Sequence, residues 1–337
     1  EMLLKGRADR IEYAEGDDEG QNETEDVFSH IEHEHDIDML AEVLRASPVS
    51  VCCIHHELQQ KTSIAWPGET TRLLRDALAV LVLRILGHRW PMQDQYEEER
   101  GEPFLDSKWI DEDGIIPLIA GTGEETLADR LRRYLDDEYG SDRGPEVEKE
   151  ITMALGWKAG QQWGSQKAMS LDHWLKREFF KRHVSQFKKR PIAWHLTSEK
   201  GTFQTIVYYH KFDKNRLQLL RSRYVRQMLD ELQRELGATR GESMNREALA
   251  RVEELENKIE DVRRFDERLQ LLLEGRERDA RIWCPWKSEG EQPQGWDPDI
   301  NDGVRVNIAP IQRLELLAGP VLSKKDLNSL LAPEERS

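Results

Sequence analysis

The chain has 337 residues and a formal net charge of −16, with 38% hydrophobic and 34% charged residues. It is long enough for two or three domains, and its composition favours amphipathic helices over a buried parallel sheet, whose strands would be continuous apolar runs. The longest apolar run, residues 77–83, is too short to span a bilayer, and Cys52, Cys53 and Cys284 form no disulfide framework, so we expect a cytoplasmic protein with no membrane contact.

The first forty residues hold fourteen acidic and three basic side chains. Within them, residues 12–25 contain few apolar side chains, which is typical of a solvated linker. We therefore expect residues 1–40 to form an acidic linker or domain-connecting segment. The abrupt first residues, EMLLKGRADRIEY, favour a piece excised from a longer protein.

Helical periodicity follows this acidic segment. It begins near residue 36 and returns over residues 69–86, where apolar side chains recur at steps of three and four and Gly87 is placed to end the helix. Residues 126–139 and 170–186 show the same spacing, whereas residues 156–164 are rich in Trp and Gly and predict an irregular loop. We expect residues 41–186 to form a helical spacer domain.

The remaining residues, 187–337, combine strands with long helices. Residues 191–196 and 202–209 are rich in β-branched and aromatic side chains and flank a turn that contains glycine, so they predict an antiparallel strand pair. Residues 216–236 and 245–273 predict two helices that form an antiparallel hairpin about 30 Å or more long. A polar loop, a short strand at residues 304–308 and a final helical stretch complete this recognition or packing segment. The predicted fold is mainly α with a small β part.

The apolar stripe of the second long helix has two interpretations. A repeat at steps of three and four is usually the seam between two packed helices. A hairpin of this length can also act as a scaffold that positions flanking domains. We favour the seam, with scaffolding as its consequence.

Candidate metal ligands occur twice near the N-terminal end. Structural zinc sites usually have two cysteines or histidines separated by a few residues, with a second half-site further on. The cysteines are adjacent and no second half-site follows, so we favour solvated surface histidines and ordinary buried cysteines and predict no metal site. The candidates were His30, His33 and His35 with Glu32, Glu34 and Asp36, and separately Cys52, Cys53, His55 and His56.

Motifs for covalent catalysis or phosphate binding do not occur in the sequence. It contains no G-x-S-x-G elbow, no Walker loop and no G-x-G-x-x-G. We therefore predict no catalytic and no cofactor-binding residue in this chain.

A basic segment stands out in this acidic chain. The 51 residues from Lys176 to Arg226 carry a charge of +11, so the other 286 residues carry −27. One interpretation is a face that binds DNA phosphates, with an affinity that falls as salt rises. The other is pairing with the acidic remainder of the fold or of a neighbouring domain. The candidate DNA-binding residues are Lys176, Arg177, Lys181, Arg182, Lys188, Lys189, Arg190, Lys214, Arg216, Arg221, Arg223 and Arg226.

Four ordered motifs carry a resemblance to a known family. They are LGHRWP (residues 86–91), DEDGIIPL (111–118), RPIAWHLTSEKGTFQTIVYYHKFDKNRLQLLRSRYV (190–225) and DINDGVRVNIAPIQ (299–312). In this order they resemble the C-terminal, post-catalytic region of the PglX-like adenine-specific DNA methyltransferases of BREX phage-defence systems. The related single-chain type IIG restriction–modification enzymes share the region.

The resemblance implies a division of labour. In the family, an N-terminal domain binds S-adenosylmethionine and flips an adenine for N6 methylation, and the C-terminal region supplies spacers and target recognition. This chain has no N-P-P-Y tetrad and no glycine-rich S-adenosylmethionine loop. We therefore expect it to be inactive alone, and to act on double-stranded DNA together with an N-terminal methyltransferase domain and other defence-system proteins. The alternative is a helical scaffold that docks other defence components or a phage inhibitor.

Overall fold

The computed structural model describes residues 66–89, 97–98, 101, 103, 105–241 and 245–333. The expected linker over residues 1–40, the helix expected from residue 36 and part of the LGHRWP motif lie outside these residues. The candidate metal ligands also lie outside them: His30, Glu32, His33, Glu34, His35, Asp36, Cys52, Cys53, His55 and His56.

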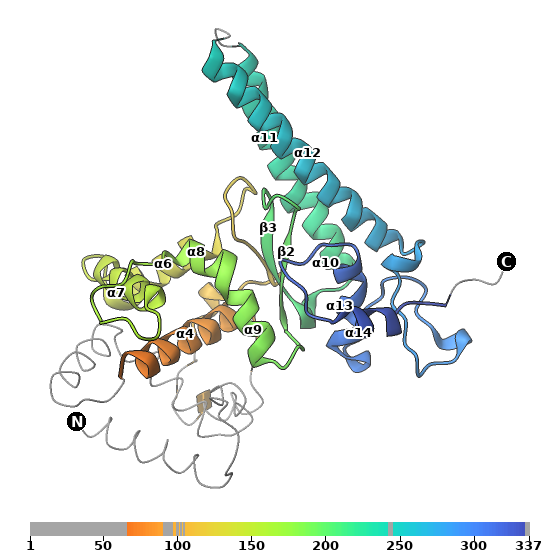
Figure 1. Cartoon of the computed structure of the whole chain (residues 1–337), viewed down its shortest axis with the longest axis horizontal. Helices are drawn as coiled ribbons and strands as arrows, with labels where there is room; N and C mark the ends of the chain where they lie inside the picture. The colour runs from red at the N-terminus through yellow and green to blue at the C-terminus, as the bar shows by residue number, and fades with distance from the viewer. Residues whose placement is uncertain are drawn as a thin grey trace.

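Helices dominate the described residues, and one small antiparallel sheet lies at the centre (Figure 1). Shorter helices occupy one side of the sheet, a long helical hairpin projects away from it, and the C-terminal helices pack on the other side. The predicted fold class, mainly α with a small β part, is confirmed.

The sheet contains the predicted strand pair and one further strand. Strands β2 (Ala193–Thr197) and β3 (Gln204–Tyr208) pair antiparallel, with His195 opposite Ile206. Strand β1 (Ile115–Pro117) pairs with the free edge of β3, which gives the order β1-β3-β2. We did not predict β1, because three residues ending in proline are too short to show a period of two.

The helices beside the sheet begin with α4 (Trp66–Ile85), whose second half is buried on every side. Helices α6 (Leu127–Tyr139) and α7 (Gly144–Gly156) pack against each other. Helix α8 (Leu171–Trp174), the π-helical segment η3 (Leu175–Phe179) and α9 (Phe180–Gln186) form one continuous helix. The helices predicted at residues 69–86, 126–139 and 170–186 are thus confirmed. Helix α7 was missed, although its buried residues Val147, Ile151 and Ala154 have helical spacing.

The predicted hairpin is also present. Its first arm runs through α10 (Lys214–Leu219), the π-helical η5 (Leu220–Val225) and α11 (Arg226–Gly241), and its second arm is α12 (Arg246–Glu274). Helix α11 extends to Gly241, five residues beyond the predicted end at residue 236. The apolar stripe of α12 is buried from Leu255 to Leu272, as a seam requires.

Hydrogen bonds fix α12 to the sheet. The buried Asp261 carboxylate accepts from the Ser198 hydroxyl at 2.6 Å and from the backbone N–H groups of Lys200 and Thr202 at 3.0 and 3.2 Å. These bonds hold the turn between β2 and β3 against the hairpin. The orientation of the hairpin is therefore set by a buried charged group.

The strand predicted at residues 304–308 is wrong. This segment begins helix α13 (Val304–Arg313), which the short helix α14 (Lys324–Ser329) follows. The alternation of Val304, Val306 and Ile308 suggested a strand, but all residues from 306 to 311 are buried. Burial on several faces removed the polar positions by which a helical period is recognised.

Candidate nucleic-acid interface

The structure divides the twelve predicted DNA-contacting residues into two groups. One group forms ion pairs within the chain: Lys176, Arg182, Arg221 and Arg223. The other is exposed and has no side-chain hydrogen bond or ion pair among the described residues: Arg177, Lys181, Lys188, Lys189, Arg190 and Arg226. Lys214 and Arg216 are half-buried at the start of α10.

Arg182 joins α9 to α4. Its guanidinium donates to the carboxylate of Asp76, which is fully buried, and Gln186 donates to the same oxygen at 2.8 Å. A buried carboxylate is costly unless a cation and hydrogen bonds compensate it. We therefore assign Arg182 to the stability of the fold.

Arg221 and Arg223 hold η5 in place. Arg221 forms a two-pronged ion pair with Asp266 of α12, with both N···O distances at 2.8 Å. Arg223 donates to Glu124 at 2.7 and 3.0 Å and to Asp113 at 3.3 Å. Both guanidinium groups are therefore engaged with carboxylates of the chain itself.

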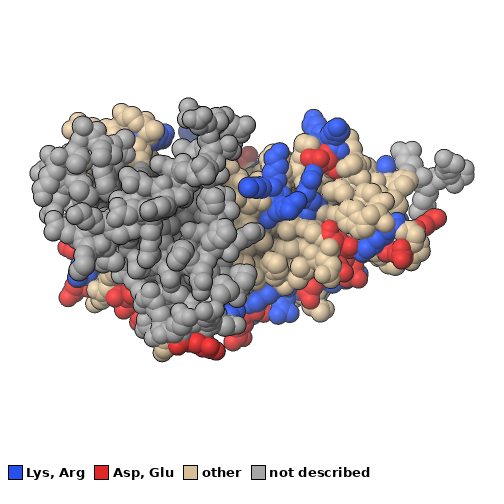
Figure 2. All heavy atoms as spheres, turned by 90° about the horizontal axis from the view of Figure 1, so that it is seen from below, with Lys and Arg blue, Asp and Glu red and all other residues tan. Residues whose placement is uncertain are grey.

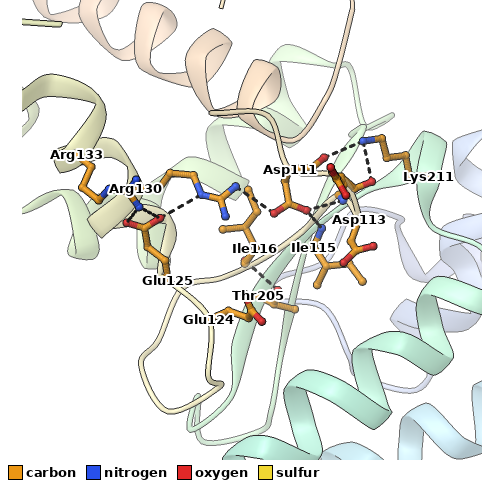
Figure 3. A network of polar contacts seen from close by, with 12 residues as sticks. Asp111, Asp113, Ile115, Ile116, Glu124, Glu125, Arg130, Arg133, Thr205 and Lys211 are labelled. Carbon is orange, nitrogen blue, oxygen red and sulfur yellow. Dashed lines mark hydrogen bonds and ion pairs between the residues drawn. The ribbon is translucent and has the colours of Figure 1, made fainter. Parts of the chain in front are cut away.

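The DEDGIIPL motif forms a polar network beside them (Figure 3). The Asp111 carboxylate accepts from the backbone N–H groups of Gly114 and Ile115 and pairs with Arg130 at 3.1 Å. The Lys211 ammonium group donates to the backbone carbonyls of Asp111 and Glu112 at 2.9 and 3.2 Å. This motif therefore fixes β1 to α6 and to η4 (Tyr209–Lys211).

Carboxylates in the same network are neutralised. Glu125 pairs with Arg130 and Arg133 (Figure 3). Asp113 and Glu124 pair with Arg223. In the part of the chain that the structure describes, no group of three His, Cys, Asp or Glu side chains could hold a metal ion.

The exposed cations include a turn of three consecutive basic residues between α9 and β2. We call Lys188, Lys189 and Arg190 the basic turn. Lys188 and Lys189 both have left-handed backbone conformations, with φ of 48° and 62°. Such φ values are costly for residues other than glycine and are found where the surroundings impose them.

Local hydrogen bonds impose this conformation. The Lys188, Lys189 and Arg190 N–H groups donate to carbonyls of residues 184–187 at 2.8–3.0 Å, which caps the end of α9. The result is a fixed turn that directs three cations into solvent.

His183 fixes the chain on the other side of the turn. Its Nε2 accepts from the backbone N–H groups of Ile192 and Ala193, both at 3.0 Å. Burial lowers the pKa of His183 to about 3, so the ring is neutral and able to accept at pH 7. His183 thereby ties the end of α9 to the start of β2, with the basic turn between them.

Figure 2 shows the molecule of Figure 1 from below. Lys and Arg side chains gather on this lower face, below the end of α9. Arg190 also lines an open groove of about 690 Å³ between the basic turn and the C-terminal helices. Two of the most exposed large apolar side chains, Trp286 at 62% and Ile300 at 51%, line the same groove. The groove is therefore lined both by the Arg190 cation and by exposed apolar side chains.

Sequence reasoning missed the groove. Trp286 lies in a loop rich in Pro, Gly and Gln. Arg305, which also lines the groove, lies in the segment that we predicted as a strand. The available signal was a tryptophan in a polar loop, where no hydrophobic periodicity accounts for it. That signal does not indicate which surface the indole faces.

Two further observations concern other classes of function. No helix among the described residues is long and apolar enough to cross a membrane. Cys284 is buried, and burial raises its thiol pKa to about 11, which does not suit a nucleophile.

Comparison with known proteins identifies related sequences, although the chain matches no protein-family model. It is 27% identical over 185 residues to the adenine-specific methyltransferase PglX of Lacticaseibacillus casei (strain Zhang), which covers 54% of this chain and 14% of that protein. It is 27% identical over 207 residues to the adenine-specific methyltransferase BrxX of Escherichia coli O9:H4 (strain HS), covering 58% and 16%. The predicted relationship to PglX-like proteins is confirmed, and the chain spans less than a fifth of each relative.

S-adenosylmethionine is the cofactor that this relationship implies for a whole methyltransferase. Nucleotide-like cofactors bind where a glycine-rich loop follows a parallel strand and leads into a helix. The described sheet is antiparallel throughout, and the sequence has no such loop. The described residues therefore do not fit this cofactor, and we assign them no catalytic step.

Proposed function

We propose that this chain is the spacer and DNA-recognition region of an adenine-N6 DNA methyltransferase from a BREX-like phage-defence or restriction–modification system. Residues 41–186 act as the spacer, and residues 187–337 contact double-stranded DNA. The methyl-transfer chemistry belongs to a partner domain that binds S-adenosylmethionine.

The observation that carries this proposal is the basic turn. A protein with a net charge of −16 repels DNA at long range, so a DNA-contacting face requires cations that internal carboxylates do not neutralise. Lys188, Lys189 and Arg190 meet this condition and are held in a fixed conformation. Phosphate contacts of this kind position a protein on DNA without reading its sequence.

The experiment compares two triple variants of equal charge change. One neutralises the basic turn (K188Q/K189Q/R190Q), and the control neutralises Lys149, Lys158 and Lys167, which are exposed in or near α7. Duplex binding is followed by fluorescence anisotropy between roughly 50 and 200 mM salt. We expect the basic-turn variant to lose about three units of the slope of log affinity against log salt, since each phosphate contact contributes roughly 0.9.

The control variant is expected to keep the wild-type slope. Equal slopes for the two variants would mean that general charge governs binding, and would refute the role of the basic turn. Circular dichroism of both variants confirms that the fold is retained.

One observation favours a second function, a scaffold that docks another protein. The hairpin of α11 and α12 projects away from the body (Figure 1), and Leu249 near its free end is 54% exposed. In this alternative the hairpin contacts a methyltransferase domain or another defence component. Leu249→Asp is expected to abolish co-elution with a separately supplied methyltransferase domain of the PglX relative, and unchanged co-elution would count against docking through this end.

A further inference from the structure

We infer that the groove beside the basic turn holds one unstacked nucleotide of bound DNA, with its base on the indole of Trp286 and its phosphate on Arg190. This inference rests on the proposed DNA-binding function and assigns that function a base-contacting site.

The first step is the exposure of Trp286. A tryptophan that is 62% exposed leaves much of its apolar surface in water, and exposed apolar groups that form a contiguous surface mark binding sites. Ile300, at 51%, lines the same groove. The two side chains therefore give one apolar surface at a single place in the fold.

The second step is the rigidity of the loop that carries Trp286. The Gln292 side chain accepts from the Cys284 N–H at 3.0 Å and donates to the carbonyls of Cys284 and Lys287, both at 2.8 Å. Lys287 also pairs with Asp302 at 2.6 Å. Because the backbone on both sides of Trp286 is fixed, its Cα is held beside the groove, and a ligand that stacks on the indole loses no affinity to ordering of the loop.

In the described part of the chain, the charged side chains that line the groove leave one cation, Arg190, available to a ligand. The two carboxylates that line the groove already have cations: Asp302 pairs with Lys287 and Asp326 pairs with Arg305 at 2.9 Å. Arg190 has no such partner among the described residues, and the two lysines of the basic turn adjoin it. The groove therefore presents a surplus of positive charge at one end, which complements a phosphate.

The volume of the groove and the chemistry of its lining suit a nucleotide. A groove of about 690 Å³ lies within the range of small-ligand sites, so it can accommodate a nucleotide. Aromatic platforms with neighbouring cations bind unpaired bases, because every base has a face that stacks and a phosphate that carries charge. An acidic peptide would use the cations but would leave the indole without a planar partner, so DNA is the occupant that uses both.

The test uses a DNA duplex with a single bulged 2-aminopurine, whose fluorescence falls when it stacks on an aromatic ring. Trp286→Ala is expected to lower affinity for this duplex by roughly 5- to 150-fold, the range for one stacked base, and to abolish the quenching. Trp286→Phe keeps an aromatic ring and is expected to retain most of both effects. Lys158→Ala, which truncates an exposed side chain just after α7, is the control and is expected to behave as wild type.

The outcomes separate this inference from the proposed function. Loss of bulge binding in Trp286→Ala, with binding to a fully paired duplex kept within about twofold, supports the stacking site. Wild-type quenching and affinity in Trp286→Ala overturn it, even if the basic-turn variant still loses its salt dependence and the phosphate role stands. If the wild-type chain binds no DNA, both proposals fail together.

The same experiments also detect two other possible occupants of the groove, a free nucleotide and a second copy of the chain. Binding of free deoxyadenosine monophosphate that depends on Trp286, in a chain that neither binds nor quenches the bulged duplex, would assign the groove to a free nucleotide and overturn the inference. Self-association of the chain that Trp286→Ala abolishes would assign the groove to a second copy, with the same consequence.

Discussion

Replacing His183 tests whether a buried neutral histidine positions the basic turn. Its Nε2 accepts two backbone N–H groups, from Ile192 and Ala193, both at 3.0 Å. His183→Phe keeps an aromatic ring between Phe179 and Phe187 but removes the acceptor. His183→Gln keeps an acceptor but does not titrate.

The magnitude follows from the two donors. A buried N–H group without a partner costs about 1–3 kcal/mol, so His183→Phe is expected to lower the free energy of unfolding at pH 7 by roughly 2–6 kcal/mol. His183→Gln is expected to lower it by less.

The pH dependence gives a second, independent magnitude. The folded-state pKa, about 3, lies below the ordinary value of 6.5, because burial disfavours the charged ring. The stabilisation is therefore complete above pH 6.5 and is lost as the pH falls toward 3. At pH 5 the loss attributable to this group is about 2 kcal/mol, from about 1.4 kcal/mol per pKa unit.

Urea unfolding at pH 7 and pH 5, followed by far-UV circular dichroism, measures both quantities. Wild type is expected to lose about 2 kcal/mol more than either variant between the two pH values, because only wild type titrates at residue 183. Equal losses in all three proteins would refute the assignment of a neutral acceptor. A His183→Phe variant as stable as wild type at pH 7 would refute the role of the two hydrogen bonds.

Three further predictions follow from the contacts of the fold. Asp261→Asn is expected to cost roughly 2–4 kcal/mol at pH 7, since the carboxylate accepts three hydrogen bonds. Burial acts to raise the pKa of Asp261, but hydrogen bonds led by that from Ser198 outweigh it and lower the pKa. The stability difference between wild type and Asp261→Asn should therefore fade as the pH falls below about 4. An equal difference at pH 7 and pH 3.5 in urea unfolding would contradict this account. Gly275→Ala is expected to lower the melting temperature, because φ is 61° and a Cβ atom would lie 2.6 Å from the backbone of a neighbouring loop. Gly237→Ala, in open space on α11, should raise the melting temperature slightly. Equal shifts in the two variants would contradict the packing argument. Arg223→Gln breaks only an exposed ion-pair cluster, so less than about 1 kcal/mol of stability should be lost. Duplex affinity should change far less than in the basic-turn variant. Comparable losses of affinity in the two variants would return Arg223 to the DNA interface.

The sequence alone located most of the helices and the hairpin because their signal is local. The stripe from Leu255 to Leu272 repeats at steps of three and four, so one helical face had to be buried against something. The basic segment was also visible, since charge is counted without knowing the fold. The motifs that carry the family relationship are likewise linear.

Tertiary structure decided which of those charges remain available to a partner. Arg182 pairs with Asp76, which is 106 residues away, whereas Arg190, eight residues further along, faces solvent. Nothing in the spacing of the basic residues distinguishes the two, because the carboxylate that neutralises one of them comes from a different helix.

The candidate groove depended on tertiary structure even more strongly. It brings Arg190, Trp286 and Ile300 together from segments about a hundred residues apart. The segment after residue 303 was also mispredicted, because the unbroken burial of residues 306–311 hid the helical period. Local patterns determine which elements form, and the packing of distant elements determines which side chains share a surface, since contact energies depend on distance in space and not on separation along the chain.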